Sequence, residues 1–174
     1  MDNEKEGCCK VMSAIQLKVK KLHKDAVIPF KAHKSDAGFD LFSTEDINIV
    51  PGETLIIKTG IAVQLPPNFE IQIRPRSGVT SKTKLRVQLG TVDEGYRGEL
   101  GIIIDNISPF AVNDVGVNYI DGSPEKYDCT IYQIRKGDKL AQFVVNELPE
   151  VEIVVEEDLN DGDRGENGFG STGV

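Results

Sequence analysis

Residues 74–78 (Arg-Pro-Arg-Ser-Gly) have the residue types of a small anion site. A strand-like run meets a proline here, so the Arg76 guanidinium, the Ser77 hydroxyl and the Gly78 N–H can converge on one oxyanion. The alternative interpretation is an ordinary strand end with solvated arginines. The segment therefore predicts an anion site only if other residues converge on the same place.

Residues 90–98 (Gly-Thr-Val-Asp-Glu-Gly-Tyr-Arg-Gly) carry an acid and an aromatic ring between two glycines. Exposed backbone at Gly90 suits the edge of a nucleobase, and the Tyr96 ring suits the face of a sugar. Asp93 beside a bound phosphate would orient a water molecule and accept its proton as a general base. The alternative is a tight turn in which the aspartate bonds to nearby backbone.

Two further polar side chains lie in apolar surroundings. Asp40 follows a small Ala-Gly pair and has apolar neighbours on both sides, so we expect an inward-facing carboxylate that must be paired. It would hold an arginine of another segment, contact a hydrated metal ion, or form an internal ion pair. Gln142 is the one amide in the strand-like run that follows the 136–138 turn, and it should donate to backbone or to a phosphate.

Residues 164–174 form a glycine-rich tail that cannot make a stable helix or strand alone. An arginine, hydroxyls and one aromatic ring among glycines suit a phosphate chain joined to a flat ring. The alternative is a frayed, solvated terminus. The groups available for binding are the Arg164 guanidinium, the Phe169 ring, the Gly170 N–H and the Ser171 and Thr172 hydroxyls.

The composition limits the function. The 174 residues, 39% of them hydrophobic, suit one domain with a substantial core. A formal net charge of −8 opposes binding of a nucleic acid polymer. No run approaches the roughly 20 apolar residues of a membrane span. Three cysteines, with Cys8 and Cys9 adjacent, support neither a disulfide framework nor a zinc site, so we expect a soluble protein of a reducing compartment.

The elements that position these residues are short strands. Alternating or continuous apolar runs separated by Gly, Pro and Asp turns predict an all-β sandwich or barrel with at most one short helix, around residues 79–84. We expect a disordered extension over 1–13, a β domain over 14–163 and a flexible lid over 164–174. Predicted strands cover the first alternating run from residue 15 and 47–50, 54–58, 61–65, 69–73, 85–89, 100–105, 115–120, 127–134, 140–145 and 151–155.

Taken in order, five segments resemble the motifs of the trimeric dUTPases (deoxyuridine triphosphatases). They are residues 37–41, 74–78, 90–98 with Asn106 downstream, 137–142, and the glycine-rich tail. The resemblance covers roughly residues 14–174. It implies a distorted jelly-roll β-sandwich that forms a homotrimer with shared active sites, in the cytoplasm of a bacterium or a phage-infected host. It also implies Mg²⁺-assisted hydrolysis of dUTP to dUMP and pyrophosphate.

The resemblance also implies a role for each candidate residue. Asp93 matches the general base that activates water for attack on the α-phosphorus, and Tyr96 matches the ring that excludes a 2′-hydroxyl. Backbone at Gly90 would read uracil, and Asp40 would support the site through water. Mg²⁺ would be held mainly by substrate phosphates and water. The remaining matches are phosphate contacts by Arg76, Ser77, Gly78 and Gln142, closing-tail contacts by Arg164, Gly170, Ser171 and Thr172, and Phe169 over the base.

The chain departs from compact family members over residues 107–135, which form an insert. Alternation on both sides of the 121–124 turn predicts a protruding β-hairpin. The insert is either a tolerated surface loop or, as in similar phage and Gram-positive members, a site for a protein partner. Two alternative functions stay open at this point: a dUTP-sensing regulatory protein that acts through the insert, and a dCTP deaminase-like enzyme on the same fold.

Overall fold

The fold is that of a computed structural model, which describes residues 14–110, 115–123, 129–163 and 165. The predicted extension over 1–13 and the tail, apart from residue 165, lie outside the described residues. The elements in chain order are β1 (Lys18–Lys21), β2 (Phe39–Phe42), β3 (Ile47–Ile49), β4 (Thr54–Gln64), β5 (Phe69–Pro75), α1 (Ser77–Lys82), β6 (Leu85–Val87), β7 (Gly90–Val92), β8 (Glu99–Asn106), β9 (Val115–Tyr119), β10 (Cys129–Ile134) and β11 (Lys139–Glu147).

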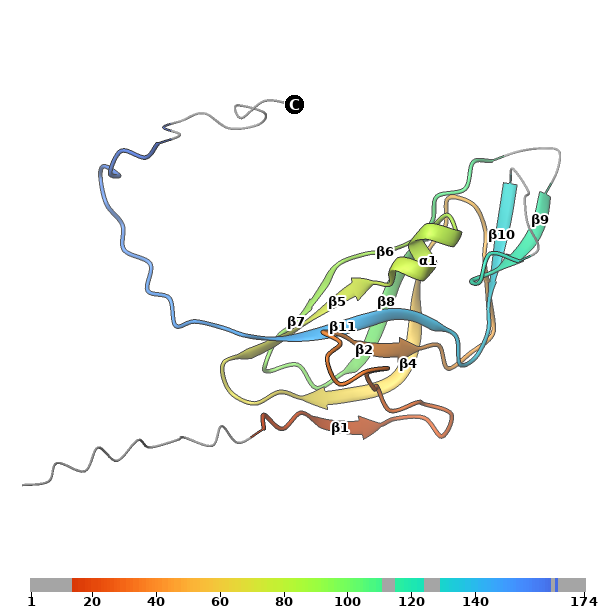
Figure 1. Cartoon of the computed structure of the whole chain (residues 1–174), viewed down its shortest axis with the longest axis horizontal. Coiled ribbons are helices and arrows are strands. Elements are labelled where there is room, and N and C mark those ends of the chain that lie inside the picture. Colours follow the sequence, from red (N-terminus) through yellow and green to blue (C-terminus); the bar gives the residue numbers. More distant parts are fainter. Residues whose placement is uncertain (1–13, 111–114, 124–128, 164, 166–174) are drawn as a thin grey trace, which may run out of the picture.

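The strands form three sheets (Figure 1). Two have four strands, in the orders β1-β4-β8-β6 and β2-β11-β5-β7, and the third has three strands in the order β3-β10-β9. Along β8, Ile102 and Ile104 are buried while Ile103 between them is exposed, as a sheet with one covered face requires. The predicted all-β sandwich with one short helix is confirmed.

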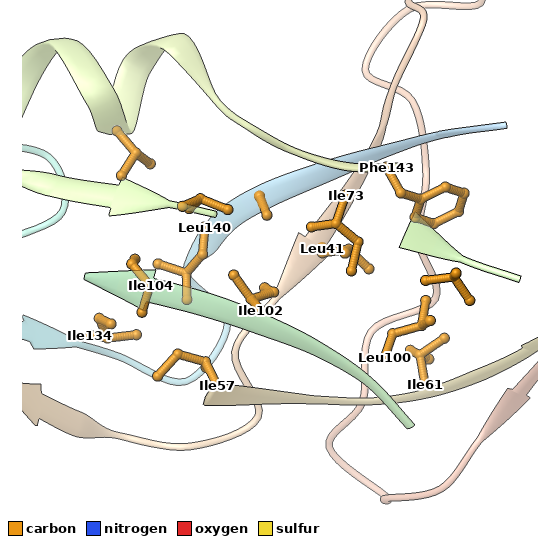
Figure 2. Close-up of a cluster of buried hydrophobic side chains, with 14 of the residues drawn as sticks. Leu41, Ile57, Ile61, Ile73, Leu100, Ile102, Ile104, Ile134, Leu140 and Phe143 are labelled. Atoms are coloured by element: carbon orange, nitrogen blue, oxygen red, sulfur yellow. The ribbon is translucent and has the colours of Figure 1, made fainter. Parts of the chain in front are cut away.

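The core lies between the two four-stranded sheets. Figure 2 shows side chains from β4 and β8 facing those from β2, β5 and β11. Ten labelled members of this cluster are Leu41, Ile57, Ile61, Ile73, Leu100, Ile102, Ile104, Ile134, Leu140 and Phe143. Each such side chain contributes about 1.5–3 kcal/mol when fully buried. The packing fixes β2, β5 and β11, and several of the candidate site residues lie on these strands or directly after them.

Some predicted elements differ from the observed ones. The runs 54–58 and 61–65 belong to one strand, β4, whose pairing with β8 shifts register between Lys58 and Ala62. The helix lies over Ser77–Lys82 rather than 79–84, so its first residues are those of the anion-type segment. Within the described residues, no helix has the length and apolar character needed to cross a membrane.

The predicted hairpin in the insert is wrong. β9 and β10 pair in parallel, with Val115 opposite Cys129 and Tyr119 opposite Gln133. The Asp-Gly turn does form, because Gly122 adopts φ +87° and donates its N–H to the Tyr119 carbonyl. That turn ends β9, but the next strand, β10, runs parallel to β9 rather than antiparallel to it as in a hairpin. β10 also pairs with β3, so the second half of the insert belongs to the body of the protein.

Asn106 attaches the insert to the rest of the fold. Its buried amide donates to the carbonyls of Ile49 (2.9 Å) and Thr130 (2.8 Å), and its oxygen accepts from the Ser108 N–H. Because a buried amide that loses its partners costs about 1–3 kcal/mol, these bonds fix β10 against β3. The insert is therefore part of the folding unit at this point.

The predicted strand over 151–155 is also wrong for the isolated chain. The segment has no regular secondary structure, and Val151, Ile153 and Val155 are exposed. It follows β11 away from the body of the molecule (Figure 1). The alternating sequence is strand-like, but a strand needs a partner for its N–H and C=O groups, and within the described residues this segment has none.

Candidate functional site

The Asp40 hollow is a surface cavity of ≈ 310 Å³ where β2, β11 and the start of α1 meet. Five sequence-predicted site residues lie together in it, although they come from segments up to about a hundred positions apart. Its lining residues are Ala32, Asp36, Ala37, Gly38, Asp40, Arg76, Ser77, Gly78 and Gln142.

The Asp40 carboxylate lies at the centre of an ion-pair cluster. One of its oxygens is 3.0 Å from Arg76 Nε, and the other is 2.9 Å from Lys139 Nζ. Asp40 is 8% exposed, and a carboxylate this deeply buried requires such partners. The structure thus confirms the predicted ion pair to an arginine of another segment.

Arg76, Ser77 and Gly78 lie where β5 ends and α1 begins. Besides its pair with Asp40, the Arg76 guanidinium donates from Nη1 to the Lys139 carbonyl at 3.0 Å. Arg76 is half-buried and Ser77 and Gly78 are exposed toward the hollow that all three line. The interpretation of Arg76 as a solvated strand end is therefore wrong.

Gln142 is held between β5 and the loop before β2. Its Nε2 donates to the Pro75 carbonyl at 3.1 Å, which is the backbone partner expected as one alternative. The amide lies directly against Gly38, and a Cβ on Gly38 would collide with Oε1 and Cδ of Gln142. Only glycine fits at this position without displacing the amide. The sequence alone did not reveal this reason for a glycine at position 38.

The Tyr96 hollow is a separate cavity of ≈ 180 Å³ with mainly apolar walls, between β7, β8 and the 93–98 turn. Its lining residues are Ile73, Gly90, Thr91, Val92, Tyr96, Glu99, Gly101 and Ile103. Tyr96 donates its hydroxyl to the Glu99 carbonyl at 2.9 Å, and its ring lies over Gly98, where a Cβ would collide with it. The predicted pair of Gly90 and Tyr96 is therefore brought together here.

Asp93 lies at the end of β7, beside this second hollow, with an exposed side chain. Its carbonyl accepts the Tyr96 N–H at 3.0 Å, closing the turn between the two residues. The turn is thus closed by the Asp93 backbone, whereas the predicted alternative was a bond from the Asp93 side chain to nearby backbone. That side-chain bond does not form among the described residues, and the Asp93 carboxylate is exposed to solvent. This carboxylate is sterically accessible to a water molecule and a substrate.

Among the described residues, the two hollows share no lining residue. One gathers the predicted phosphate contacts, and the other gathers the predicted base and sugar contacts. A single chain therefore presents the candidates as two half-sites. Outside the described residues lie the candidates of the tail: Arg164, Phe169, Gly170, Ser171 and Thr172.

Sequence reasoning missed Lys139, which pairs with Asp40 and lies beside two aromatic rings. Its signal was present as a lysine at the start of the strand-like run that contains Gln142. One residue earlier, partial burial raises the pKa of the Asp138 carboxyl above its ordinary value. Asp138 Oδ2 accepts the Arg135 N–H at 2.8 Å, which closes the turn that leads into β11.

The described residues contain no group of three or more His, Cys, Asp or Glu side chains arranged to hold a metal ion. The carboxylates of the Asp40 hollow are Asp36 and Asp40, and both have partners within the chain. Such a donor set fits a hydrated cation that is bound mainly by other ligands better than it fits a directly coordinated one.

The family model, a sequence relative and two solved structures that match this chain all belong to one family. The dUTPase family model matches residues 24–114. A deoxyuridine 5'-triphosphate nucleotidohydrolase of Clostridioides difficile is 45% identical over 159 residues, which cover 90% of this chain and 97% of the relative.

Solved structures are similar over most of the chain. The dUTPase of Staphylococcus bacteriophage 80alpha with dUPNHPP has a TM-score of 0.84 and 37% identity, covering 91% of this chain and 99% of its own. A mutant dUTPase from phage phi11 of S. aureus, described with a coordinated structural Mg(II) ion, has a TM-score of 0.76 and 37% identity, covering 84% and 99%.

Proposed function

Because this chain belongs to the dUTPase family, we propose that it hydrolyses dUTP to dUMP and pyrophosphate. The observation that carries this function is the division of its candidates between two hollows of different chemistry. The Asp40 hollow presents Arg76, a hydroxyl and amide donors, and the Tyr96 hollow presents apolar walls, a ring and the small residue Gly90. The phosphate end of a nucleoside triphosphate matches the Asp40 hollow, and its nucleoside end matches the Tyr96 hollow.

We propose that a homotrimer joins the Asp40 hollow of one subunit to the Tyr96 hollow of a neighbour. Support comes from apolar groups that the isolated chain leaves exposed. Ile56 on β4 lies directly opposite Ile103 on β8, and these side chains are 66% and 39% exposed on the outer face of their sheet. Leu89 after β6 is 76% exposed. Large apolar side chains left exposed in this way support a protein contact at this part of the surface.

In the proposed mechanism, Asp93 accepts a proton from the attacking water as the water oxygen bonds to the α-phosphorus. The bond from the α-phosphorus to the oxygen that bridges it to the β-phosphorus breaks, and that oxygen leaves with pyrophosphate. Arg76, Ser77, Gly78 and Gln142 hold the phosphates and stabilise the charge that develops on them. The hydrolysis involves little covalent work by the protein, so these residues act mainly through positioning.

Substrate choice would be made in the Tyr96 hollow. The Tyr96 ring, held by its bond to Glu99 and by close contact with Gly98, would pack against the deoxyribose and leave no room for a 2′-hydroxyl. Backbone groups at Gly90 would hydrogen-bond the uracil edge. A site that pairs with particular edge groups discriminates more strongly than an apolar pocket of similar size.

When bound with the triphosphate, Mg²⁺ would neutralise part of the substrate charge. Asp40 and Asp36 line the hollow and are the carboxylates that would accept hydrogen bonds from its water ligands. Their other task is independent of the metal: Asp40 orients Arg76, and Asp36 accepts the His33 N–H at 2.8 Å to fix the loop beside the hollow.

The tail is proposed as a lid over the occupied site. Arg164, Gly170, Ser171 and Thr172 would contact the outer phosphates, and Phe169 would cover the base. Closing a glycine-rich segment costs conformational entropy, which these contacts must offset. The Phe169→Ala variant should therefore lose turnover without loss of the fold, and unchanged turnover would rule out this role for the ring.

The insert is proposed as a place for a protein partner, at the sheet edge formed by β9. Among the described strands β9 is paired only with β10, so its other edge has no strand partner within that part of the chain and could accept a further strand. Removal of residues 111–123 should abolish partner binding and spare dUTP turnover, because β10 and Asn106 remain. Loss of turnover would instead make this segment part of the enzyme.

The proposed location of the protein is the cytoplasm, where its nucleotide substrate is formed.

The function is tested by pyrophosphate release from dUTP, UTP and dTTP with Mg²⁺ present. We expect rapid turnover of dUTP alone, and a much lower rate for a chain that ends at Asp163, since that chain keeps both hollows but lacks the lid. Equal turnover of UTP would contradict the role of Tyr96. Ammonia release from dCTP would assign the chain to deaminase chemistry instead.

A further inference from the structure

Lys139 is not among the lining residues of the Asp40 hollow, and its side chain is 36% exposed. Its Nζ is 2.9 Å from Asp40 Oδ2, 4.8 Å from the centre of the Phe30 ring and 5.7 Å from that of the Phe42 ring. Phe30 and Phe42 stack on each other with ring centres 5.5 Å apart. The ammonium group is thus held by one carboxylate and by the faces of two rings, which restricts its position.

An irregularity in strand pairing places Lys139 there. β11 pairs with β2 so that Gln142 lies opposite Asp40 and Ala141 opposite Leu41, but Lys139 rather than Leu140 lies opposite Phe42. Because alternate residues share a face, this bulge brings Lys139 to the face of Asp40 and Gln142. Leu140 remains fully buried in the core. A regular strand would have directed Lys139 to the opposite face.

The charges of the cluster do not cancel. Asp40 carries one negative charge between two cations, so these three groups together have one net positive charge, while Asp36 adds a further carboxylate to the lining of the hollow. Without the Lys139 ammonium, Asp40 and Arg76 would form a neutral pair, and the guanidinium would be drawn fully to the carboxylate. With it, Asp40 is shared, and Arg76 retains attraction for an incoming anion.

Lys139 also fixes Arg76 through its backbone, since its carbonyl accepts from Nη1 of Arg76 at 3.0 Å. The guanidinium is therefore oriented from two directions, by the Lys139 carbonyl and by an Asp40 carboxylate that Lys139 itself holds. A side-chain substitution removes only the second of these restraints. This separation makes the contribution of the ammonium group measurable.

We propose that Lys139 is a positioning residue for phosphate recognition: its ammonium group holds Asp40 so that Arg76 is oriented toward, and its charge available to, the substrate phosphates. The proposal rests on the proposed function, because it assumes that the Asp40 hollow receives the phosphate end of the nucleotide. It adds a residue that does not touch the substrate and acts through two others.

The test compares Lys139→Met, which keeps the length of the side chain without its charge, with Lys139→Arg, which keeps the charge. Lys136→Met is the matched control, because Lys136 lies in the same turn and pairs with Asp25 at 2.7 Å, outside the hollow. Calorimetry with Mg²⁺ measures the Kd of the intact protein for dUPNHPP and for deoxyuridine, and steady-state kinetics measures kcat and KM for dUTP.

We expect Lys139→Met to weaken dUPNHPP binding and raise KM by about tenfold, the scale of one lost charge-assisted contact, and to leave deoxyuridine binding unchanged. Lys139→Arg should recover most of the loss, and Lys136→Met should match the wild type. Equal weakening of both ligands would mean that Lys139 only supports the fold, and unchanged dUPNHPP binding would equally overturn the proposal.

Two further readouts keep the outcome decisive. If Lys139→Met melts far below the wild type, Phe30→Leu replaces it as the test variant, because that change loosens the ring contact with Lys139 and keeps every charge. Phe30→Leu should weaken dUPNHPP binding by about threefold and leave deoxyuridine binding unchanged. Equal weakening of both ligands, or of neither, would overturn the proposal. Wild-type protein that does not turn over dUTP would refute the proposed function instead. Wild-type turnover with normal Lys139→Met affinity would refute the role of Lys139 alone.

Discussion

The Asp40 hollow and the Tyr96 hollow differ in how their functional side chains are held. Asp40 is 8% exposed and fixed by two cations, whereas Tyr96 is 46% exposed and fixed by one hydroxyl bond and by the backbone of its own turn. In the first hollow the central carboxylate has both of its ion-pair partners within the chain, whereas in the second the tyrosine side chain is largely exposed. This difference agrees with the proposal that the second surface faces another subunit and its bound substrate.

The largest expected effect comes from removal of the base beside the Tyr96 hollow. Asp93→Asn should lower kcat by about 100- to 10,000-fold and change KM little, because general-base catalysis acts on the transition state. The side chain is exposed, so the fold should be unaffected. Rapid-quench kinetics and a thermal melt measure the two quantities, and a variant that keeps wild-type kcat would remove Asp93 from the mechanism.

A methyl group at Gly38 should disturb the Asp40 hollow next most strongly. A Cβ there collides with the Gln142 amide, which must leave its bond to Pro75. Overpacking of this kind costs about 1–3 kcal/mol, so Gly38→Ala should lower the free energy of unfolding and reduce kcat/KM together. Ala37→Gly is the control at the neighbouring position. Full activity and stability in Gly38→Ala would show that Gln142 is not held as described.

A methyl group at Gly98 should act on the Tyr96 hollow in a different way. It displaces the Tyr96 ring, which is exposed and able to move, so stability should change little. The displaced ring no longer fills the place of a 2′-hydroxyl, and the preference for dUTP over UTP should fall by about tenfold. The ratio of kcat/KM for the two nucleotides is the measurement. An unchanged ratio would separate Tyr96 from sugar recognition.

The smallest expected effect concerns the turn that leads into the Asp40 hollow. Burial raises the pKa of Asp138 above its unfolded value, so ionisation of this carboxyl opposes folding. The penalty is absent below the unfolded pKa of about 4 and is fully present once the pH exceeds the folded pKa. Asp138→Asn keeps an acceptor for the Arg135 N–H. Its Tm should therefore equal that of the wild type at pH 3 and exceed it at pH 7; the reverse order would contradict the sign.

The sequence predicted much of this arrangement because its signals are local. Apolar alternation located most strands, and an acidic residue between apolar neighbours correctly indicated that Asp40 is paired. The individual roles of Asp93, Tyr96 and the phosphate contacts stay predictions. The division into two hollows became visible only in the fold, because it depends on the neighbours of β5. Ile73 on β5 pairs with Gly90 on β7, and Arg76 follows directly after the end of β5, so this one segment lies between the two half-sites.

Three features escaped the sequence for physical reasons. The bulge that brings Lys139 to Asp40 is a matter of pairing register, which side-chain alternation within one strand does not reveal. The parallel pairing of β9 and β10 depends on where the chain goes after the Asp-Gly turn, whereas the turn itself was correctly located. The strand-like run over 151–155 has the composition of a strand but finds no partner among the described residues of its own chain.

Mixed trimers test the central claim, that each site joins the Asp40 hollow of one subunit to the Tyr96 hollow of another. Arg76→Ala chains lack the first half-site, Asp93→Asn chains lack the second, and trimers of either variant alone should be nearly inactive. After co-expression in equal amounts, each mixed trimer should contain one intact site, which restores about a quarter of wild-type turnover of dUTP. Mixed trimers, verified by native mass spectrometry, that stay as inactive as the pure variants would contradict a site shared between subunits.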